Sequence, residues 1–211
     1  RSRPARPRRA PSSVGARARC YARRVHDTKL SCALLVAMPQ LQDPNFKRAV
    51  VQLIEHGEQG SFGLVLNREV DLTASDLCES LELAWQGDPA ARIRWGGPVQ
   101  GNTGWVLFGD DVALEVPEQA VQRVLPGIHF AGSLAVLEEV AQWPPEDVCL
   151  FLGYAGWGPG QLESELAAGS WLLAPPSAEI VFGVDPDAMW DRVVRGLGID
   201  PATLIATSGV H

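Results

Sequence analysis

The residues best suited to chemistry are a histidine and a glutamate, preceded by an aspartate and an arginine. Glu55 and His56 end an apolar run, and Asp43 and Arg48 stand upstream of it. An imidazole titrates near neutral pH, so His56 could serve as a general base. No partner nucleophile is evident, because Ser61 falls in a predicted loop and there is no G-x-S-x-G elbow. The alternative is that Asp43, Arg48 and Glu55 fix turns or form ion pairs.

A second candidate is the glycine-rich stretch from Gly153 to Glu163, between an apolar run at 148–152 and a helical pattern that begins at Gln161. We predict a strand-turn-helix corner, with Gly158 as helix N-cap and Pro159 at the first helical position. A phosphate-binding loop would need Lys and Ser/Thr after the last glycine, and this chain has Gln161 and Leu162 there. Open N–H groups at the helix start could still bind an anion; the alternative is a tight corner with Trp157 packed on the core.

Charge is divided unevenly along the 211 residues. Residues 1–24 hold nine arginines and no acid, which leaves nine basic against twenty-five acidic side chains in the remainder, or about −16. An acidic body argues against direct DNA binding by the folded part. No apolar run reaches the eighteen residues typical of a membrane-spanning helix, so no membrane partner is expected.

The first thirty residues read as a disordered, Arg-rich tail, and residues 31–211 as the folded domain. The tail composition fits an organellar transit peptide, an extension reflecting arginine-rich codon usage, or a nucleic-acid-binding arm. We therefore expect a plastid or mitochondrial location if the source is eukaryotic, and a cytoplasmic one if it is bacterial.

Neither a metal nor another cofactor is expected. The four cysteines have no C-x-x-C spacing, and no Cys/His set has the spacing of zinc ligands. Cys149 lies in an apolar run and is expected to be an inert small hydrophobe. Cys78, near Asp76 and Glu79, lacks the cationic surroundings that lower a thiol pKa. His129 is expected to be a satisfied, half-buried side chain.

Runs of apolar residues predict the elements of the fold. We expect strands at 34–38, 49–56, 62–67, 93–99, 104–108 and 148–152, and helices at 72–83, 133–143 and about 186–196. A hairpin is predicted across 57–60, with His56 at its tip not far from Asn67, and a second hairpin across 96–98. Strands and helices intermix without a βαβ repeat, which favours an α+β fold with a mixed, mostly antiparallel sheet.

Four aromatic residues, Trp95, Trp105, Tyr154 and Trp157, could form a stacking surface for single-stranded nucleic acid or a flat ligand. The alternative, which we favour, is a set of core and turn anchors, because only Arg92 and Arg94 supply nearby positive charge.

Four motifs together resemble the AlgH/YqgE family of small bacterial and plant proteins. They are L-L-V-A-M-P with D-P-N-F-K-R at 34–48, E-H with G-L-V-L-N-R at 55–68, W-G-G-P-V at 95–99, and the stretch at 153–165. They come in the family's order and cover about residues 31–200. The resemblance implies one α+β domain whose sheet folds toward a pseudo-barrel. It also implies a family with an unsettled biochemical role and a transcriptional-regulator label.

The sequence departs from the family at two positions, with Ala49 where Ser or Thr is common and Glu69 where Pro is common. If a hydroxyl were essential chemistry, Ala49 would remove it. We therefore favour a non-enzymatic regulatory or binding module with a protein or small-molecule partner, acting on transcription only indirectly. The alternative is a ligand-processing enzyme that uses His56, Glu55 and Arg48 beside the glycine-rich corner. The candidate surface comprises Asp43, Arg48, Glu55, His56, Asn67, Gly97, Tyr154, Gly156, Trp157, Gly158, Gln161 and Glu163.

Overall fold

The computed structural model describes residues 30–111 and 114–207. Its ten strands are β1 (Leu34–Ala37), β2 (Val50–Gly57), β3 (Gly60–Val65), β4 (Glu69–Thr73), β5 (Arg92–Trp95), β6 (Val99–Phe108), β7 (Gln122–Leu125), β8 (Ile128–Ala131), β9 (Val148–Trp157) and β10 (Trp171–Ala174). The α-helices are α2 (Ala74–Ser80), α3 (Leu134–Gln142), α4 (Gln161–Ala167), α5 (Ala178–Gly183), α6 (Pro186–Gly196) and α7 (Pro201–Thr207), with 3-10 turns η1 (Leu30–Cys32) and η2 (Glu118–Ala120). The Arg-rich segment predicted as a tail lies outside the described residues, apart from Leu30.

The strands form one mixed sheet in the order β10-β1-β2-β3-β9-β6-β8-β7, with β4 paired to β5 and β5 paired to β9. Every pairing is antiparallel except that of β5 with β9. The predicted α+β class with a mostly antiparallel sheet is therefore confirmed. Within the described residues β10 and β7 do not pair, so the sheet curls without closing into a barrel.

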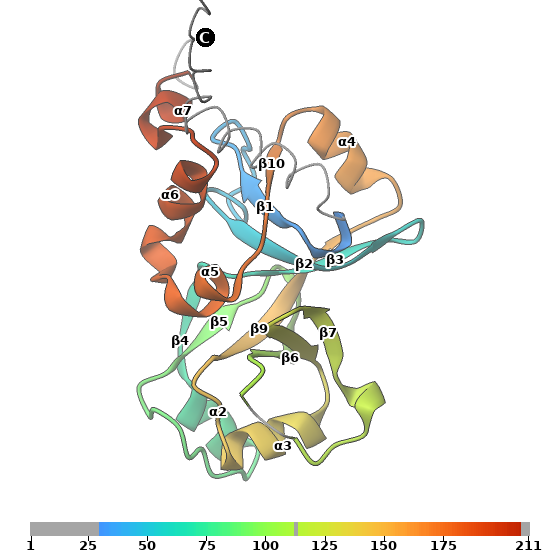
Figure 1. Ribbon diagram of the computed structural model, residues 1–211, viewed down its shortest axis with the longest axis vertical. Coiled ribbons are helices and arrows are strands. Elements are labelled where there is room, and N and C mark those ends of the chain that lie inside the picture. The colour runs from blue at the N-terminus through green and yellow to red at the C-terminus, as the bar shows by residue number, and fades with distance from the viewer. Residues whose placement is uncertain (1–29, 112–113, 208–211) are drawn as a thin grey trace, which may run out of the picture.

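Strand β9 joins the two halves of the molecule (Figure 1). In the upper half β1, β2, β3 and β10 lie beside α4, with α6 and α7 along one side, while α2 and α3 close the lower end. The core has three apolar clusters. One packs α5 and α6 on the sheet, one packs α4 and the β10 end on β1–β3, and one lies under α2 and α3.

Several predicted elements are confirmed, and others are wrong. Strands β1 and β2 and helices α3 and α6 occur where they were predicted. Residues 72–83 are not one helix, because β4 runs to Thr73 and α2 covers only 74–80. The second hairpin does not exist, since β5 and β6 each pair with β9 and not with each other. Helix α7 was not predicted.

The glycine-rich stretch is also not the predicted corner. Residues 153–157 continue β9, and only 158–160 form the turn. Helix α4 begins at Gln161 with Gly160 as N-cap in the left-handed conformation, so Gly158 and Pro159 precede the helix. Glycine adopts the left-handed conformation without a steric cost. The helix can therefore start after Gly160, two residues later than the position of Pro159 predicted.

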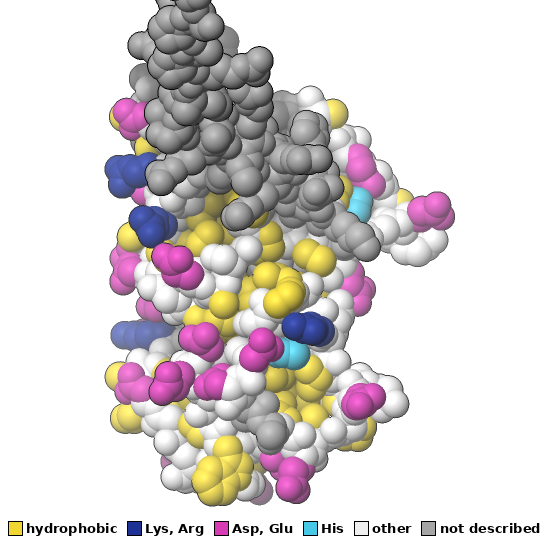
Figure 2. Space-filling model, in the orientation of Figure 1, with side chains coloured by type: hydrophobic (Ala, Val, Ile, Leu, Met, Phe, Trp, Pro, Cys, Tyr) yellow, Lys and Arg dark blue, Asp and Glu magenta, His cyan; other side chains and the backbone are white. Residues whose placement is uncertain are grey.

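Carboxylates are scattered over the visible face, whereas Lys and Arg side chains are few there (Figure 2). This distribution agrees with the acidic balance of the sequence beyond the arginine-rich start. No helix in the described part of the chain combines the length and apolar character needed to cross a membrane.

Trp157→Ala tests the packing of the upper half. The Trp157 side chain is 5% exposed, stacks on Phe46 with ring centroids 6.1 Å apart, and donates from Nε1 to Glu165 at 3.0 Å. We expect the free energy of unfolding to fall by about 3–5 kcal/mol, measured by urea denaturation, because a large buried ring is lost. The matched control Trp143→Ala removes a 72% exposed indole and should change stability by less than about 0.5 kcal/mol. Equal effects of the two substitutions would contradict this packing role.

Candidate functional site

The turn at residues 43–48 is held in place by short polar contacts. Asp43 Oδ1 accepts a hydrogen bond from the Asn45 backbone N–H at 2.8 Å. Arg48 has a φ of 55°, which is uncommon for a residue with a side chain. Asn67 stabilises this conformation from the end of β3: its Nδ2 donates to the Arg48 carbonyl at 2.9 Å, and its Oδ1 accepts from the Val50 N–H at 2.8 Å. The turn-fixing alternative for Asp43 is confirmed, and Asn67 fixes the turn as well.

Two arginines are oriented by this turn and by tryptophan rings. Arg68 Nη2 donates to the carbonyls of Lys47 at 3.0 Å and Pro44 at 3.2 Å, and its guanidinium lies 5.6 Å from the Trp95 ring centroid. The Arg48 guanidinium lies 4.8 Å from the Trp190 ring centroid and 4.0 Å from Asp191. Such contacts restrict the rotamers of both side chains, which lowers the entropy that a ligand must overcome.

These arginines line a surface hollow of about 610 Å³, which we call the rim hollow. It is lined by Lys47, Arg48, Asn67, Arg68, Glu69, Asp185, Pro186, Asp187, Trp190 and Asp191. The residues from the turn and from 67–68 are therefore mainly basic, whereas Glu69 and the start of α6 contribute acidic side chains. Oδ1 of Asp191 is sealed from solvent yet accepts no hydrogen bond from the described residues. The rim hollow thus presents both basic and acidic side chains to a polar ligand.

The polar cluster predicted from sequence is divided between the two ends of β2. Arg48 precedes the strand and His56 lies near its far end, so their Cα atoms are separated by roughly 25 Å at the rise of an extended chain. Asn67 lies beside Val50 at the Arg48 end and is not near His56. The grouping of His56 with Asp43, Arg48 and Asn67 is therefore wrong, because hairpin pairing places the ends of β2 far apart.

His56 instead meets two residues that the sequence did not join to it. Its Nδ1 lies 2.8 Å from Ser61 Oγ, and its Nε2 lies 3.8 Å from Glu163 Oε1. Ser61 is not in a loop but is paired with His56 across β2 and β3, and its exposed fraction is 9%. Glu55 is exposed on β2, opposite Phe62. A serine, a histidine and a glutamate thus form a chain of polar contacts beside the start of α4.

Close backbone contact requires glycine at position 97 of the candidate surface and at the neighbouring position 153. A Cβ at Gly97 would overlap the backbone carbonyl carbon of Tyr154, and one at Gly153 would overlap the Gly97 carbonyl oxygen. Gly156 pairs with Phe62 across β9 and β3. Steric contact between backbones explains the glycines at 97 and 153 without a ligand, whereas a Cβ at Gly156 would approach only the Tyr154 and Val99 side chains.

Gln161 helps to order the turn before α4, since its Oε1 accepts from the Gly158 N–H at 3.0 Å. Glu165 was missed by sequence reasoning: Oε2 accepts from the Nε1 groups of Trp157 at 3.0 Å and Trp171 at 2.7 Å, and Oε1 accepts from Gln161 at 2.9 Å. The spacing of Gln161 and Glu165, four residues apart on a helix, was the available signal. The contact with Trp171 depends on tertiary structure.

The four aromatic residues proposed as a stacking surface do not form one surface. Trp105 and Tyr154 pack with Phe62, whereas Trp157 packs with Trp171, and Trp95 lies under Arg68. The expectation for His129 is confirmed: it is half-buried and its Nε2 lies 2.7 Å from Asp110 Oδ1. That hydrogen bond lowers the pKa of the Asp110 carboxyl.

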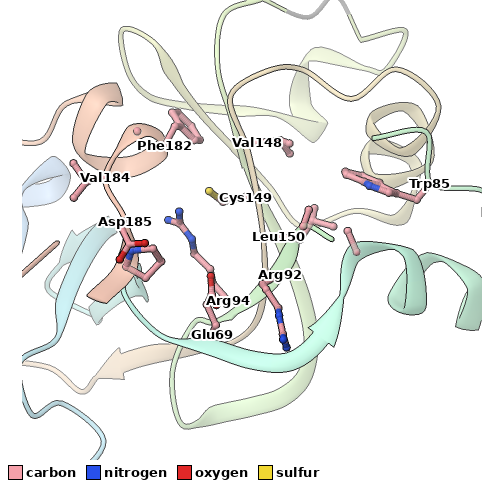
Figure 3. Close-up of a pocket in the computed structure, with 14 residues that line it drawn as sticks. Glu69, Trp85, Arg92, Arg94, Val148, Cys149, Leu150, Phe182, Val184 and Asp185 are labelled. Carbon is pink, nitrogen blue, oxygen red and sulfur yellow. The ribbon is translucent and has the colours of Figure 1, made fainter. Parts of the chain in front are cut away.

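A second cavity, of about 270 Å³, adjoins the rim hollow and contains the side chain of Arg94 (Figure 3). The two hollows share Glu69, Asp185 and Pro186. Arg94 is buried, and sequence reasoning noted it only as part of a basic pair with Arg92. A charged residue between Ile93 and Trp95 in a strand was the signal that could have identified it.

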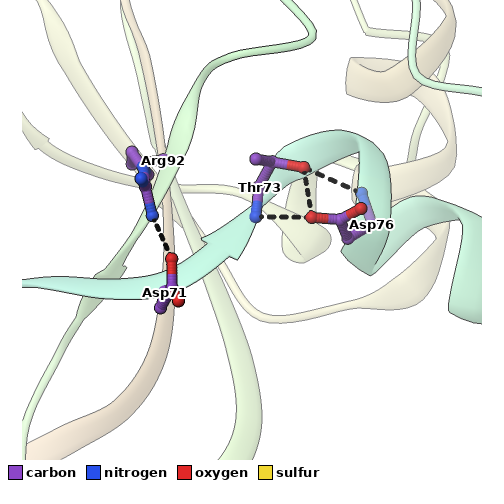
Figure 4. Close-up of polar contacts among 4 residues, drawn as sticks. All are labelled: Asp71, Thr73, Asp76 and Arg92. Atoms are coloured by element: carbon purple, nitrogen blue, oxygen red, sulfur yellow. Dashed lines mark hydrogen bonds and ion pairs between the residues drawn. The ribbon is translucent and has the colours of Figure 1, made fainter.

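Arg92 differs from Arg94 because it has a carboxylate partner (Figure 4). Its Nη1 lies 2.6 Å from Asp71 Oδ1, and this hydrogen-bonded ion pair raises the pKa of Arg92. Strand β4, which carries Asp71, ends at Thr73, the N-cap of α2. There the Asp76 N–H donates to Thr73 Oγ1 and the Thr73 N–H donates to the Asp76 carboxylate, which forms a capping box. Hydrogen bonds from Thr73 lower the pKa of Asp76.

Comparison with known proteins gives consistent matches over most of the chain. A family model described as AlgH-like matches residues 34–202. A UPF0301 protein of Myxococcus xanthus is 43% identical over 183 residues, covering 86% of this chain and 98% of the relative. A UPF0301 protein of Ruegeria pomeroyi is 41% identical, with 85% and 98% covered. The solution structure of the AlgH protein from Pseudomonas aeruginosa superposes with a TM-score of 0.68 at 34% identity, covering 88% of this chain and 97% of that chain.

Asn67 offers a test of how the turn positions Arg48. Asn67→Asp keeps the acceptor for the Val50 N–H but replaces the donor to the Arg48 carbonyl with a second oxygen, so two acceptors face each other. We expect a loss of about 1–3 kcal/mol in the free energy of unfolding, from denaturant titration. The control Asn45→Asp alters an exposed amide in the same turn while keeping its backbone bond to Asp43, and should have little effect. Unchanged stability of Asn67→Asp would show that the bond to Arg48 does not hold the turn.

Proposed function

We propose that the chain, which belongs to the AlgH-like family, is a non-enzymatic regulatory module that binds a small phosphate- or carboxylate-bearing molecule in the rim hollow. The observation that carries this proposal is the presence of two arginines, Arg48 and Arg68, oriented at one concave site. Guanidinium groups present forked donors that match phosphate and carboxylate oxygens. The volume falls within the range usual for small-molecule sites.

The acidic side chains that line the rim hollow restrict the charge of the ligand that would fit. Asp185, Asp187 and Asp191 add negative charge, so a bare polyanion such as a nucleic-acid backbone would be repelled there. A molecule with an anionic group at one end and hydroxyl or amine donors at the other complements both sets of side chains. Because the chain beyond its arginine-rich start is strongly acidic, any effect on transcription would pass through such a ligand or a protein partner.

Inorganic phosphate is the simplest probe of the rim hollow. We expect it to raise the melting temperature of the full chain at constant ionic strength, because a ligand that binds only the folded state stabilises it by mass action. Arg68→Gln and Arg48→Gln should each lose most of this shift, measured against their own phosphate-free baselines. Arg192→Gln is the matched control, because Arg192 is exposed and paired with Glu179 outside the hollow. The same phosphate shift in all four proteins would indicate a general salt effect and contradict the proposal.

The contacts among Ser61, His56 and Glu163 favour a second candidate function, nucleophilic hydrolysis. A serine hydroxyl 2.8 Å from an imidazole nitrogen can pass its proton to that nitrogen, and a carboxylate near the other nitrogen can stabilise the imidazolium. Two observations place this candidate second. Ser61 is only 9% exposed, and the carboxylate distance of 3.8 Å exceeds a hydrogen bond. The separation of Arg48 from His56 along β2 argues against an enzyme that uses His56, Glu55 and Arg48 together beside the glycine-rich corner.

His56→Gln distinguishes the two candidates. Under the binding proposal, the variant and the unaltered protein should hydrolyse p-nitrophenyl acetate at the same background rate. His129→Gln is the control, since His129 also contacts a carboxylate but has no serine partner in the described contacts. Hydrolysis above background that is lost in His56→Gln and Ser61→Ala, but kept in His129→Gln, would establish the second candidate instead.

A further inference from the structure

The cavity around Arg94 lies between the sheet and the connection from α5 to α6. Its walls come from β5, from Val148 to Leu150 on β9, and from Phe182 to Pro186. Figure 3 shows the Arg94 side chain extending into this space between Cys149 and Asp185. Phe182 and Val184 lie on the side of the cavity formed by α5 and the residues that follow it. Its volume of about 270 Å³ is near the lower end of the range usual for small-molecule sites.

Arg94 is a buried cation with unused donors. The residue is 8% exposed, and its Nη1 donates to the Val181 carbonyl at 2.8 Å. No carboxylate of the described residues lies within 4.0 Å of the guanidinium. Its remaining nitrogens have no hydrogen-bond partner among the described residues, and none of these unpaired nitrogens is sealed from solvent. Since burying an unpaired charge is costly, these donors favour an anionic group in the cavity.

The neighbouring thiol does not supply that negative charge. Cys149 Sγ faces the same Val181 carbonyl at 3.9 Å. Burial raises the pKa of the Cys149 thiol, and the opposing effect of the Arg94 charge is the smaller one. The thiol therefore stays protonated at neutral pH, and Arg94 keeps its need for an external anion.

Two carboxylates also line the cavity without contacting Arg94. Glu69 is the cross-strand neighbour of Arg94 in the β4–β5 pair. Asp185 accepts from the Asp187 N–H at 2.9 Å as N-cap of α6. A simple anion would leave the cavity with excess negative charge, and a simple cation would leave the Arg94 donors unused. A molecule that carries both charges satisfies each wall.

We propose that this cavity binds a small apolar α-amino acid. The carboxylate of the amino acid accepts hydrogen bonds from Arg94, its ammonium lies toward Glu69 and Asp185, and its side chain packs against Phe182 and Val184. This inference does not depend on the function proposed for the rim hollow, because it rests on a different cation in a different cavity. Substitutions of Arg94 and Arg68 therefore test the two sites separately.

Three probes of one shape separate the charge requirements: L-leucine, 4-methylpentanoate, which lacks the ammonium, and 3-methylbutylamine, which lacks the carboxylate. Isothermal titration of the full chain should show leucine binding at least about tenfold more tightly than either analogue, since each lost charged contact costs about that factor. L-Alanine and L-phenylalanine extend the test to smaller and larger side chains. Absence of binding by all three amino acids, or equal binding of leucine and the amine, would overturn the proposal.

Variants locate the binding in this cavity. Arg94→Met keeps an apolar stem and should lose leucine binding by at least about tenfold. Arg192→Gln is the control, because Arg192 pairs with Glu179 and does not line this cavity, and it should bind as the unaltered protein does. Glu69→Gln, on the exposed side of the cavity, should narrow the preference for leucine over 4-methylpentanoate even if Arg94→Met fails to fold. Leucine binding unaffected by both Arg94→Met and Glu69→Gln would place the amino acid elsewhere and refute the assignment.

Discussion

The structure depends on one close approach between backbones, where the connection from β5 to β6 crosses β9. Along one edge, β9 pairs with β5 at Phe151 and Leu152 and then with β3 from Ala155 onward. The exchange of partners occurs at Gly153, whose φ is 72°. Side chains at Gly96, Gly97 or Gly153 would overlap backbone atoms of the facing segment. Because backbone cannot move aside as a flexible side chain can, glycine at these positions allows one strand to hold both halves of the sheet.

The change of β9 from β5 to β3 as its partner also determines where the polar residues lie. Strand β5 carries Arg94 into the space beneath the α5–α6 connection, while the end of β3 brings Asn67 and Arg68 to the rim hollow. Each buried or oriented arginine has a different kind of partner. Arg68 has backbone carbonyls and an aromatic ring, whereas Arg94 has one carbonyl and the ring of Phe151 at 5.9 Å. A carbonyl dipole and a ring quadrupole reduce the cost of burying a charge but do not neutralise it.

Local sequence patterns were sufficient to predict the elements whose secondary structure is determined by their own residues. The β-branched run of β2 and the apolar periodicity of α3 and α6 predicted those elements nearly to their ends. They were insufficient at 153–157, where glycines indicated a turn but pairing with β3 and β6 extends the strand. Local patterns also gave the wrong hairpin at 96–98. Strands adjacent in sequence usually pair with each other, but β5 and β6 each pair with β9 instead.

For the candidate site, the sequence by itself determined the family resemblance, the acidic balance of the folded part, and the residue types available for binding. It also offered turn fixing as one role for Asp43, whose partner in the turn at residues 43–48 is local in sequence. Tertiary structure alone decided that Asn67 joins this turn and that His56 meets Ser61 and Glu163 at the far end of β2. It also decided that Arg94 is buried with no carboxylate of the described residues within 4.0 Å. The physical reason is that these contacts join residues far apart in sequence, and strand register, which no local pattern specifies, determines which side chains meet.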